Sequence, residues 1–244
     1  MKTTGHTVLV TGGGSGIGFA LASKFHRAGN RVIIMGRSES TLADAVKRLP
    51  GAEFCVADVS NAQDRARLVG RFPEVTVLIN NAGVRYGGLA MEQTEAEMMQ
   101  ELSVNVLAPV LLAQSFYPVL SQKAEAAIVN VTSGAALAPR DVAAMYAASK
   151  SALHIFTKSL RWQLEATSVR VFEVLPPVVE TAMTAFQGSH KGMITPDQLA
   201  HEFWTNFQTN RFEMLIGKVK ILHWLLRLSP ALADRVVRKI PKAE

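Results

Sequence analysis

The sequence predicts an α/β fold, a doubly wound parallel sheet of about seven strands with helices on both faces. Three observations lead to this prediction. Short runs of branched apolar residues recur along the chain, patterns of helix length lie between them, and the runs are continuously apolar instead of alternating. Continuously apolar runs are typical of strands that are buried on both faces of a parallel sheet. Their alternation with helices favours right-handed crossovers within a single sheet.

The expected elements follow one another in a regular order. The strands are HTVLVT (6–11), RVIIMG (31–36), EFCVAD (53–58), VTVLIN (75–80), AAIVNVT (126–132), VRVFEVL (169–175) and the shorter EMLIG (213–217). The helices are expected at 17–29, 39–49, 61–71, 93–122 and 143–167, and the fourth of them should break near Ser103–Asn105. Neither an internal repeat nor a linker interrupts this order, so residues 1–244 are expected to form a single domain.

The pattern loosens after the sixth strand. Methionine and aromatic side chains gather at 180–210, beyond Pro176-Pro177, which makes this segment a candidate substrate lid; a core helix at 196–209 is the alternative. Residues 218–240 are basic and apolar, and Pro230 should divide them into two short helices. Weak peripheral contact with a membrane, packing over a substrate pocket and a subunit interface are three open interpretations of this stretch.

Composition favours a protein of the cytoplasm. Apolar residues make up 48% of the chain, which is enough for one large core. The single cysteine, Cys55, has no partner for a disulfide and indicates a reducing compartment. The N-terminal residues lack the apolar stretch of a secretory signal, and the sequence shows no uninterrupted run of about 18 apolar residues. We therefore expect a soluble, cytoplasmic protein without a membrane span.

The net charge of +6 is concentrated near the C-terminus. Residues 211–244 contain 8 lysine and arginine residues against 3 acidic ones, or +5, which leaves +1 for the first 210 residues. No nucleic-acid-binding motif accompanies this charge, so DNA and RNA are not expected as partners. The six histidines show no metal-ligand spacing, and no metal site is expected.

A glycine-rich turn, TGGGSGIG at 11–18, follows the first strand and opens the first helix. This is the place of a dinucleotide-binding loop in a Rossmann-type fold, although its Gly-x-x-x-Gly-x-Gly spacing differs from the commoner Gly-x-Gly-x-x-Gly. Gly12 permits the tight turn, the middle residues bring the backbone to a pyrophosphate, and Gly18 lets helix and strand pack closely. The residues expected to bind the cofactor here are Gly12, Gly14, Ser15, Gly16, Ile17 and Gly18.

The end of the second strand bears on the choice of cofactor. It reads Gly36-Arg37-Ser38, where NAD-binding folds usually place an acidic residue on the adenine ribose. An arginine can pair with a 2′-phosphate, whereas a carboxylate would repel it. The sequence therefore favours NADP(H) over NAD(H). Glu39 lies two residues further on and Arg37 also suits a helix N-flank, so that second interpretation of Arg37 is open.

Further motifs resemble those of one known family. They are Asp58-Val59, Asn80-Asn81-Ala82-Gly83, Asn105, Ser133, Tyr146-Ala-Ala-Ser-Lys150 and the run at 176–181. With the glycine turn, their order and spacing resemble the compact single-domain branch of the short-chain dehydrogenases/reductases over residues 6–181. Pro176-Pro177 and the Gly-Lys-Val-Lys stretch at 217–220 are most similar to the bacterial DltE-like oxidoreductases within that branch.

The resemblance implies contacts between these motifs and the cofactor. Asp58 would hydrogen-bond the adenine amino group beside the backbone of Val59. The residues implied to lie under the adenosine ribose are Asn81, Ala82 and Gly83, next to Asn80, which would brace the fourth strand. A plain turn at a strand end is the alternative for the two asparagines. Val179 and Thr181 would contact the nicotinamide carboxamide, although Pro177 stands where most relatives carry glycine and removes a backbone donor.

Tyr146 and Lys150 lie four residues apart, so a helix places both on one face. A phenol has a pKa of about 10, and lowering it to about 7 requires about 4 kcal/mol, which a unit charge at about 4 Å supplies in an effective dielectric of about 20. The resemblance implies that Tyr146 is the general acid, and that Lys150 lowers its pKa and holds the nicotinamide ribose. It also implies that Ser133 stabilises the carbonyl oxygen and that Asn105 fixes a water that passes protons toward Lys150.

The implied activity is that of an NADP(H)-dependent oxidoreductase that transfers hydride between the nicotinamide and a carbonyl or alcohol substrate. The side chains of the candidate lid indicate a fairly apolar small molecule. A non-catalytic dinucleotide-sensing or scaffold protein on the same fold is the alternative, and it would tolerate loss of the serine, tyrosine or lysine. Arg140 and Asp141 are expected to border the substrate or to form a polar loop. Relatives assemble through the helices that flank the fourth and fifth strands, so a homodimer or homotetramer is expected.

Overall fold

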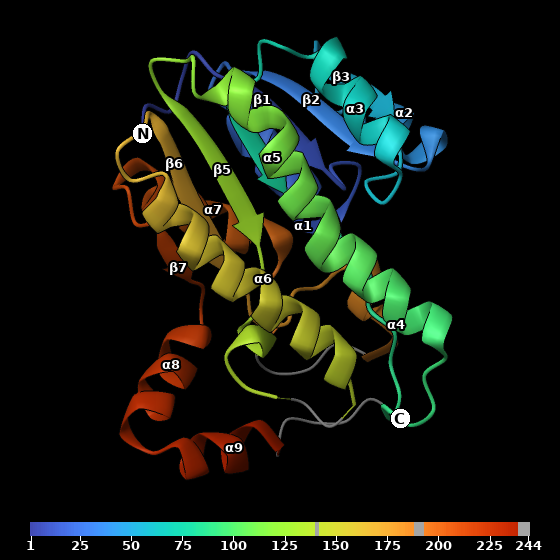
Figure 1. The fold of residues 1–244 in the computed structure, drawn as a ribbon, viewed down its shortest axis with the longest axis vertical. Helices are drawn as coiled ribbons and strands as arrows, with labels where there is room; N and C mark the ends of the chain where they lie inside the picture. Colours follow the sequence, from blue (N-terminus) through green and yellow to red (C-terminus); the bar gives the residue numbers. More distant parts are fainter. Residues whose placement is uncertain (140–141, 188–192, 239–244) are drawn as a thin grey trace.

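The fold is built on one sheet of seven parallel strands in the order β3-β2-β1-β4-β5-β6-β7 (Figure 1). The computed structural model describes residues 1–139, 142–187 and 193–238. The strands are β1 (Thr7–Thr11), β2 (Arg31–Gly36), β3 (Glu53–Val56), β4 (Val77–Asn80), β5 (Ala126–Val131), β6 (Val169–Leu175) and β7 (Glu213–Leu215). The predicted doubly wound α/β sheet is confirmed, and each strand begins within two residues of its expected start.

Helices cover both faces of the sheet. Those on one face are α1 (Gly16–Arg27), α2 (Glu39–Lys47) and α7 (Pro196–Gln208), and those on the other are α3 (Ala62–Arg71), α5 (Ala108–Leu120) and α6 (Ala144–Gln163). α4 (Glu95–Leu102) continues into α5 through a π-helical turn at Ser103–Leu107, where the sequence predicted a break. Short 3-10 turns lie at Gly134–Ala136 and Ala182–Gln187.

The aromatic side chains of α7 pack into the core and not over a pocket. Phe203 and Phe207 are fully buried, and the ring centre of Phe207 lies 5.4 Å from that of Phe25 in α1 and 5.0 Å from that of Phe172 in β6. Burying a phenylalanine side chain contributes about 1.5–3 kcal/mol, so the core fixes this helix in place. The core-helix alternative for 196–209 is the one observed, and the expectation of a lid was wrong for that part of 180–210.

The C-terminal stretch forms two short helices, α8 (Val219–Leu228) and α9 (Pro230–Arg238), in agreement with the break predicted at Pro230. Proline is tolerated as the first residue of a helix because its missing N–H would have no intrahelical partner there. The start of α8 packs closely on the turn after β5, since a Cβ on Gly134 would lie 2.9 Å from Cγ2 of Val219. Both helices lie beyond the carboxyl end of β5, at the bottom of the view in Figure 1.

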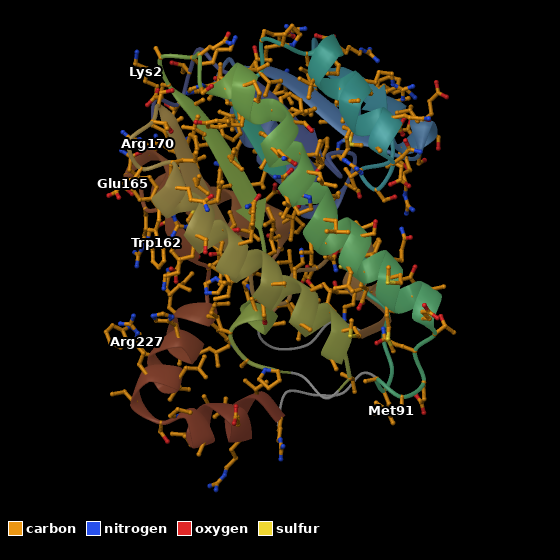
Figure 2. The ribbon with its side chains drawn as sticks, viewed as in Figure 1. Lys2, Met91, Trp162, Glu165, Arg170 and Arg227 are labelled. Atoms are coloured by element: carbon orange, nitrogen blue, oxygen red, sulfur yellow. The ribbon has the colours of Figure 1, made fainter. Side chains whose placement is uncertain are left out.

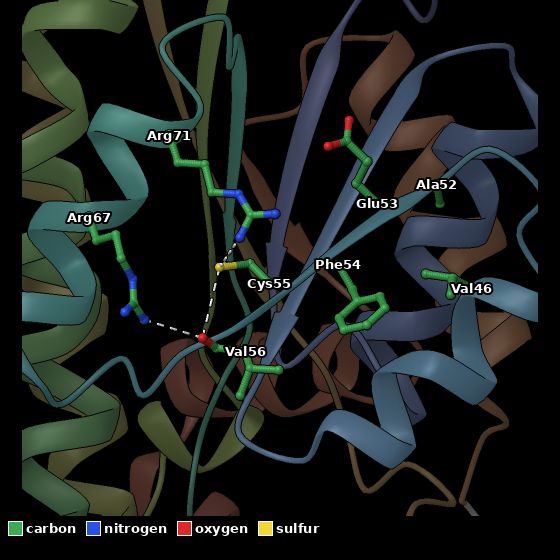
Figure 3. Close-up of a pocket in the computed structure, with 8 residues that line it drawn as sticks. All are labelled: Val46, Ala52, Glu53, Phe54, Cys55, Val56, Arg67 and Arg71. Carbon is green, nitrogen blue, oxygen red and sulfur yellow. Dashed lines mark hydrogen bonds between the residues drawn. The ribbon is translucent and has the colours of Figure 1, made fainter.

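A surface hollow lies beside the edge strand β3 (Figure 3). Cys55 is buried in this strand, and its Sγ accepts a weak hydrogen bond from Nη1 of Arg71 at 3.6 Å. Nη2 of Arg67 donates to the carbonyl oxygen of Val56 at 3.4 Å. Charged side chains commonly protect edge strands from pairing with another chain, and two arginines of α3 stand at this edge. Cys55 is thus a buried side chain that packs in the fold, as its apolar neighbours in the sequence predicted.

Candidate active site

The carboxyl ends of β1, β4, β5 and β6 border one cavity of about 700 Å³. In doubly wound sheets, ligands bind outside the carboxyl ends of the strands at the point where the strand order reverses. Here the order reverses at β1, because β2 and β3 extend to one side of it and β4 to β7 extend to the other. The residues that follow these strands therefore define the candidate site.

The glycine turn has the backbone geometry of a phosphate-binding loop. Gly12 and Gly16 have positive φ angles of 63° and 52°, which a side chain would strain. A Cβ on Gly18 would lie 2.2 Å from the carbonyl oxygen of Gly12, so glycine alone permits this close approach. Ser15 is the N-cap residue of α1, its side chain makes no capping bond, and the first turn has no acidic residue. This helix start fits a phosphate group, because its N–H groups and dipole favour an anion.

The other residues of the turn divide between cavity and core. Ser15, Gly16 and Ile17 line the cavity. Gly14 instead faces α2, because a Cβ there would lie 3.1 Å from Cγ2 of Thr41. The backbone on the cavity side of the turn is therefore the part suited to contact a pyrophosphate.

Asn81 joins the end of β4 to the glycine turn. Its Nδ2 donates to the carbonyl oxygens of Thr11 at 3.0 Å and Gly12 at 3.3 Å, and its N–H donates to Oγ1 of Thr11 at 3.0 Å. Nδ2 of Asn80 donates to Oδ1 of Asn130 in β5 at 2.9 Å, which braces β4 as expected. The two asparagines thus do more than end a strand. Ala82 and Gly83, which follow them, line the cavity.

Asp58 and Arg37 lie at the ends of neighbouring strands, β3 and β2. Oδ1 of Asp58 accepts bonds from the N–H and the hydroxyl of Ser60, at 2.8 Å and 2.6 Å. Burial opposes ionisation of Asp58, but these bonds and the positive charge of Arg37 leave its pKa lowered. Arg37 also precedes Ser38, the N-cap residue of α2, so it does flank a helix. Val59 is buried, and none of Arg37, Asp58 and Val59 lines the cavity itself.

Ser133, Tyr146 and Lys150 come together in the wall of the cavity. Ser133 follows β5, and its side chain lies close enough to the phenol of Tyr146 to lower the pKa of that group. Its Oγ also accepts a bond from the N–H of Ala135 at 3.1 Å, so the serine caps a turn as well. Lys150 lies one helical turn beyond Tyr146 in α6, with its Nζ 5.9 Å from the centre of the phenol ring. This Nζ donates to the carbonyl oxygen of Val131 at 3.0 Å.

The pKa of Tyr146 differs from the expectation. Burial raises this pKa, Ser133 and the positive charge of Arg85 lower it, the negative charge of Glu101 raises it, and the pKa is raised overall. The Nζ of Lys150 donates to a backbone carbonyl, and burial lowers the pKa of this lysine to about 8. The tyrosine pKa is thus raised and not lowered, and the expected effect of Lys150 on it stays a prediction. Because its pKa is raised, the phenol keeps its proton at neutral pH.

Arg85 and Glu101 are residues of this region that the sequence analysis did not identify. The guanidinium carbon of Arg85 lies 5.9 Å from the ring centre of Tyr146, and Arg85 lines the cavity. Glu101 in α4 is fully buried, burial raises its pKa, and its Oε1 accepts a bond from the N–H of Tyr86 at 2.7 Å. The position of Arg85, two residues after Gly83, was the available signal, because a chain leaving a strand here borders the ligand crevice.

Asn105 occupies the π-helical turn and is fully buried. Its Oδ1 accepts a bond from the N–H of Val84 at 2.9 Å, and its Nδ2 donates to Oγ of Ser149 at 3.0 Å. A Cβ on Gly83 would lie 3.1 Å from Oδ1 of Asn105 and 3.6 Å from Nζ of Lys150, so these two side chains meet behind Gly83. Single π-helical turns are frequent at functional sites. The water that Asn105 was expected to hold stays a prediction.

The segment after β6 faces the glycine turn. A Cβ on Gly16 would lie 3.1 Å from Cγ2 of Thr181, so this threonine stands against the loop. Val179 borders the cavity, but its side chain packs in the core with 3% exposed. Thr181 therefore fits the expected contact with a nicotinamide better than Val179 does.

The remaining wall of the cavity is largely apolar and comes from the C-terminal helices. Its residues there are Lys218, Val219, Ile221, Leu222, Leu225, Val236 and Val237. Arg140 and Asp141, which were expected to border the substrate, lie outside the described residues. Within residues 1–139, 142–187 and 193–238, no group of three His, Cys, Asp or Glu residues is placed to hold a metal ion.

The sequence is similar to those of known proteins. A family model described as short chain dehydrogenase matches residues 6–192. DltE of Bacillus subtilis, an uncharacterized oxidoreductase, is 42% identical over 199 residues, which cover 79% of each chain. The residues that match the family model include the glycine turn, Ser133, Tyr146 and Lys150.

Two solved structures are similar over nearly their whole length. A short chain dehydrogenase from Burkholderia cenocepacia in complex with NADP has a TM-score of 0.88 and 25% identity, covering 99% of this chain and 100% of that chain. A short chain dehydrogenase/reductase from Burkholderia phymatum in complex with NAD has a TM-score of 0.82 and 25% identity, covering 93% and 96%. The first of these proteins is bound to NADP and the second to NAD, so similarity to them does not distinguish between the two cofactors.

Proposed function

The chain belongs to the short-chain dehydrogenase family, and on this premise we propose that it is an NADP(H)-dependent oxidoreductase that interconverts a carbonyl compound and its alcohol. The observation that carries the proposal is the convergence of Ser133, Tyr146 and Lys150 in the cavity that the glycine turn borders. A dinucleotide-sensing or scaffold protein has no need of these three side chains in one cavity wall. The enzyme is therefore the better-supported of the two functions.

The proposed division of labour assigns the hydride to the cofactor when it is bound, and the proton to the protein. The hydroxyl of Tyr146 donates a proton to the carbonyl oxygen in reduction and accepts one from the alcohol in oxidation. The hydroxyl of Ser133 donates a hydrogen bond to the same oxygen and stabilises its developing charge. Because burial raises the pKa of Tyr146, the donor is already protonated at neutral pH, which supports reduction.

The remaining residues are proposed to hold the cofactor. Backbone N–H groups of the glycine turn would bind the pyrophosphate, and Lys150 would hold the nicotinamide ribose. Asn105 would fix a water that relays protons to Lys150. The residues proposed for the adenine, its ribose and the nicotinamide carboxamide are Asp58, Val59, Asn81, Ala82, Gly83, Val179 and Thr181.

The preference for NADP(H) is proposed from Arg37, which is exposed at the end of β2. Charge-assisted hydrogen bonds contribute about 1.5–3 kcal/mol, so Arg37→Ala should raise the KM for NADPH by about tenfold or more. The KM for NADH should change by less than about twofold, because NADH has no 2′-phosphate. Steady-state kinetics with both cofactors measures this difference. Arg27→Ala, at an exposed arginine that ends α1, is the matched control. An equal rise for both cofactors would argue against the assignment.

The substrate is proposed to be fairly apolar, because α8 and α9 supply an apolar wall. The part of the expected lid that borders the cavity is 181–184, where Met183 is 39% exposed. We propose that this short segment, with α8 and α9, covers the substrate. A cytoplasmic location is proposed as well, and the lone cysteine without a disulfide partner supports it.

A panel of aldehydes and ketones tests the function directly, with NADPH absorbance followed and NADH run in parallel. We expect turnover of compounds with an apolar body. At saturating NADPH, Tyr146→Phe should lower kcat by at least about 100-fold, because the proton donor is lost. Tyr117→Phe in α5 removes a hydroxyl away from the cavity and should leave kcat unchanged. Near-parental turnover by Tyr146→Phe would remove the tyrosine from the mechanism. NADPH binding without turnover of any compound would support the scaffold alternative.

A further inference from the structure

A buried polar cluster lies directly behind the candidate active site, between β5, β6 and α6. Its centre is Glu173 of β6, which is fully buried. Oε1 of Glu173 accepts a hydrogen bond from Oγ1 of Thr132 at 2.7 Å. Nδ1 of His154 in α6 lies 2.9 Å from Oε1 and 3.0 Å from Oε2 of the same carboxylate. One carboxylate therefore joins three elements of the fold.

The burial of this carboxylate makes its bonds difficult to rearrange. The side chain of Glu173 is 0% exposed and that of His154 is 16% exposed. A buried charge is costly unless hydrogen bonds satisfy it, and bonds to a charged group are shorter and stronger than neutral ones. Losing one partner leaves the carboxylate partly unsatisfied in a water-poor environment. The cluster should consequently hold Thr132 and His154 in fixed positions.

Both partners of Glu173 belong to the segments that carry the proposed catalytic residues. Thr132 stands between Val131, whose carbonyl oxygen accepts the bond from Lys150, and Ser133, which lines the same cavity as Tyr146. His154 lies four residues after Lys150 and eight after Tyr146, so α6 carries all three on one face. The end of β5 and this face of α6 thus meet both at the active site and at Glu173.

We propose that Glu173 is a positioning residue for the reaction: by binding Thr132 and His154 together, it fixes the strand end that carries Ser133 against the helix face that carries Tyr146 and Lys150. The inference rests on the proposed function for its catalytic consequence. Glu173 does not line the cavity, so it acts through its two partners and not on the substrate.

The cluster is also sensitive to pH through His154. The hydrogen bond with Glu173 is the largest of the causes that raise the pKa of His154, with burial opposing it. The charged groups that face the imidazole are Glu173 from β6, Glu213 from β7 and Lys158 from α6, and Arg161 of α6 lies near both carboxylates. Because the folded-state pKa is raised, the charged pair is present at lower pH and loses its charge as pH rises through that pKa. The bond between His154 and Glu173 should therefore weaken as pH rises.

Thr132→Val tests the proposal with a side chain of similar shape that lacks the hydroxyl. Small misplacements of reacting groups are costly, so kcat should fall about tenfold or more while the KM for NADPH stays within about twofold. Ser133 is one of the groups that lower the pKa of Tyr146. The profile of kcat against pH should have one limb that reports the titration of Tyr146. Displacing the serine should therefore move this limb to higher pH. Thr132→Ser keeps the hydroxyl and should restore both kcat and the limb.

Two further variants separate positioning from general stability. Thr157→Val removes a different buried hydroxyl, which lies in α6. The oxygen of this hydroxyl accepts a bond from Nδ2 of Asn130 at 2.9 Å. This variant should lower the melting temperature without moving the pH limb. Glu173→Gln is the direct variant and should reproduce the effect of Thr132→Val where it folds. If Thr132→Val loses stability as Thr157→Val does but keeps the parental kcat and limb, Glu173 has no positioning role.

A readout without substrate distinguishes this inference from the proposed function. Tyrosinate absorbance of the protein alone, with the Tyr146→Phe spectrum subtracted, reports the titration of Tyr146. A higher pKa in Thr132→Val than in the parent supports positioning by the cluster even if no carbonyl compound turns over. An unchanged tyrosine titration overturns the positioning inference and leaves the enzymatic proposal to the substrate panel.

Discussion

At the scale of single residues, the burial of Lys150 sets stability against function. Burial lowers its pKa to about 8, because the charged ammonium is removed from water. Relative to an unperturbed lysine near 10.5, this shift corresponds to a cost of about 3 kcal/mol at neutral pH. The bond from Nζ to the carbonyl oxygen of Val131 returns about 1 kcal/mol. A neutral side chain of similar length should therefore make the protein more stable and less active.

We predict that Lys150→Met raises the free energy of unfolding at pH 7 by about 2 kcal/mol, or the melting temperature by about 4–8 °C. The unfolded state keeps its lysine proton between pH 8 and about 10.5 whereas the folded state has lost it, so parental stability rises over this window. The difference in the free energy of unfolding between variant and parent should therefore become smaller as pH rises through this window. Thermal unfolding at several pH values measures it. Lys158→Met, at an exposed lysine of the same helix, should show no such pH dependence. A destabilised Lys150→Met protein would refute the buried-charge argument.

Residues recognisable from sequence were those whose roles depend on spacing along the chain. Tyr146 and Lys150 share a helix face because they are four residues apart, and the structure brings both to the cavity. Arg85 and Glu173 were not identified, since each meets its partners from another part of the chain. The pKa of Tyr146 differs from the value that a neighbouring charge alone predicts for a related reason, because burial acts in the opposite direction.

At the scale of elements, the glycine turn and α3 provide a matched pair of glycines. A Cβ on Gly18 would lie 2.2 Å from the carbonyl oxygen of Gly12 and 2.5 Å from Nδ2 of Asn81, so both must move. A Cβ on Gly70 in α3 would meet nothing within 4 Å. We predict that Gly18→Ala costs about 1–3 kcal/mol of stability and weakens NADPH binding at least about tenfold. Gly70→Ala should stabilise by about 1 kcal/mol and leave binding unchanged.

Urea unfolding and fluorescence titration with NADPH check this pair of glycine variants. If Gly18→Ala binds NADPH as the parent does, the close approach at the turn is not required for the cofactor. A destabilised Gly70→Ala protein would show that the environment of α3 is more crowded than the structure indicates.

Strands were easier to predict than the use made of each helix. A continuous apolar run has one favourable environment, the interior of the sheet, and all seven strands lie where such runs occur. An amphipathic helix buries one face equally well over a pocket or on a sheet, so the aromatic pattern of α7 suited a lid and a core helix. Phe25 and Phe172, which come from distant segments, decide between them in favour of the core.

At the scale of the whole molecule, one apolar helical stretch needs an explanation. Among the described residues, Glu95–Leu120 is long and apolar enough to cross a membrane by length and composition alone, with a mean hydropathy of 1.4 in an 18-residue window that is 39% buried. Uninterrupted apolar runs did not reveal it, because polar residues are interspersed. Leu112 and Phe116 on its inner side are buried against the sheet, as in a core helix. The outer side is the part left to explain.

We propose that a second copy of the chain covers this outer surface, on the face of the sheet that α5 and α6 both cover (Figure 1). Tyr117 of α5 and Ile155 and Trp162 of α6 are 36%, 61% and 65% exposed. Trp162 points away from the body of the molecule in Figure 2. Ile155 and Trp162 are seven residues apart and share a helix face, so together they form an apolar stripe. Such a stripe is typical of a subunit interface.

We predict that light scattering of the parent gives a dimer or tetramer of the 26.5 kDa chain. Introducing two charges into the stripe, with Ile155→Lys and Trp162→Lys together, should shift the protein to a 26.5 kDa species, because buried unpaired charges oppose association. Trp224→Lys in α8 is the matched control, since Trp224 is 61% exposed but lies outside the stripe. A monomeric parent would contradict this assembly, and dissociation by Trp224→Lys alone would place the interface on the C-terminal helices.

Sedimentation of the parent with anionic vesicles at physiological salt would instead support membrane contact, because basic residues flank the apolar side chains of α8 and α9.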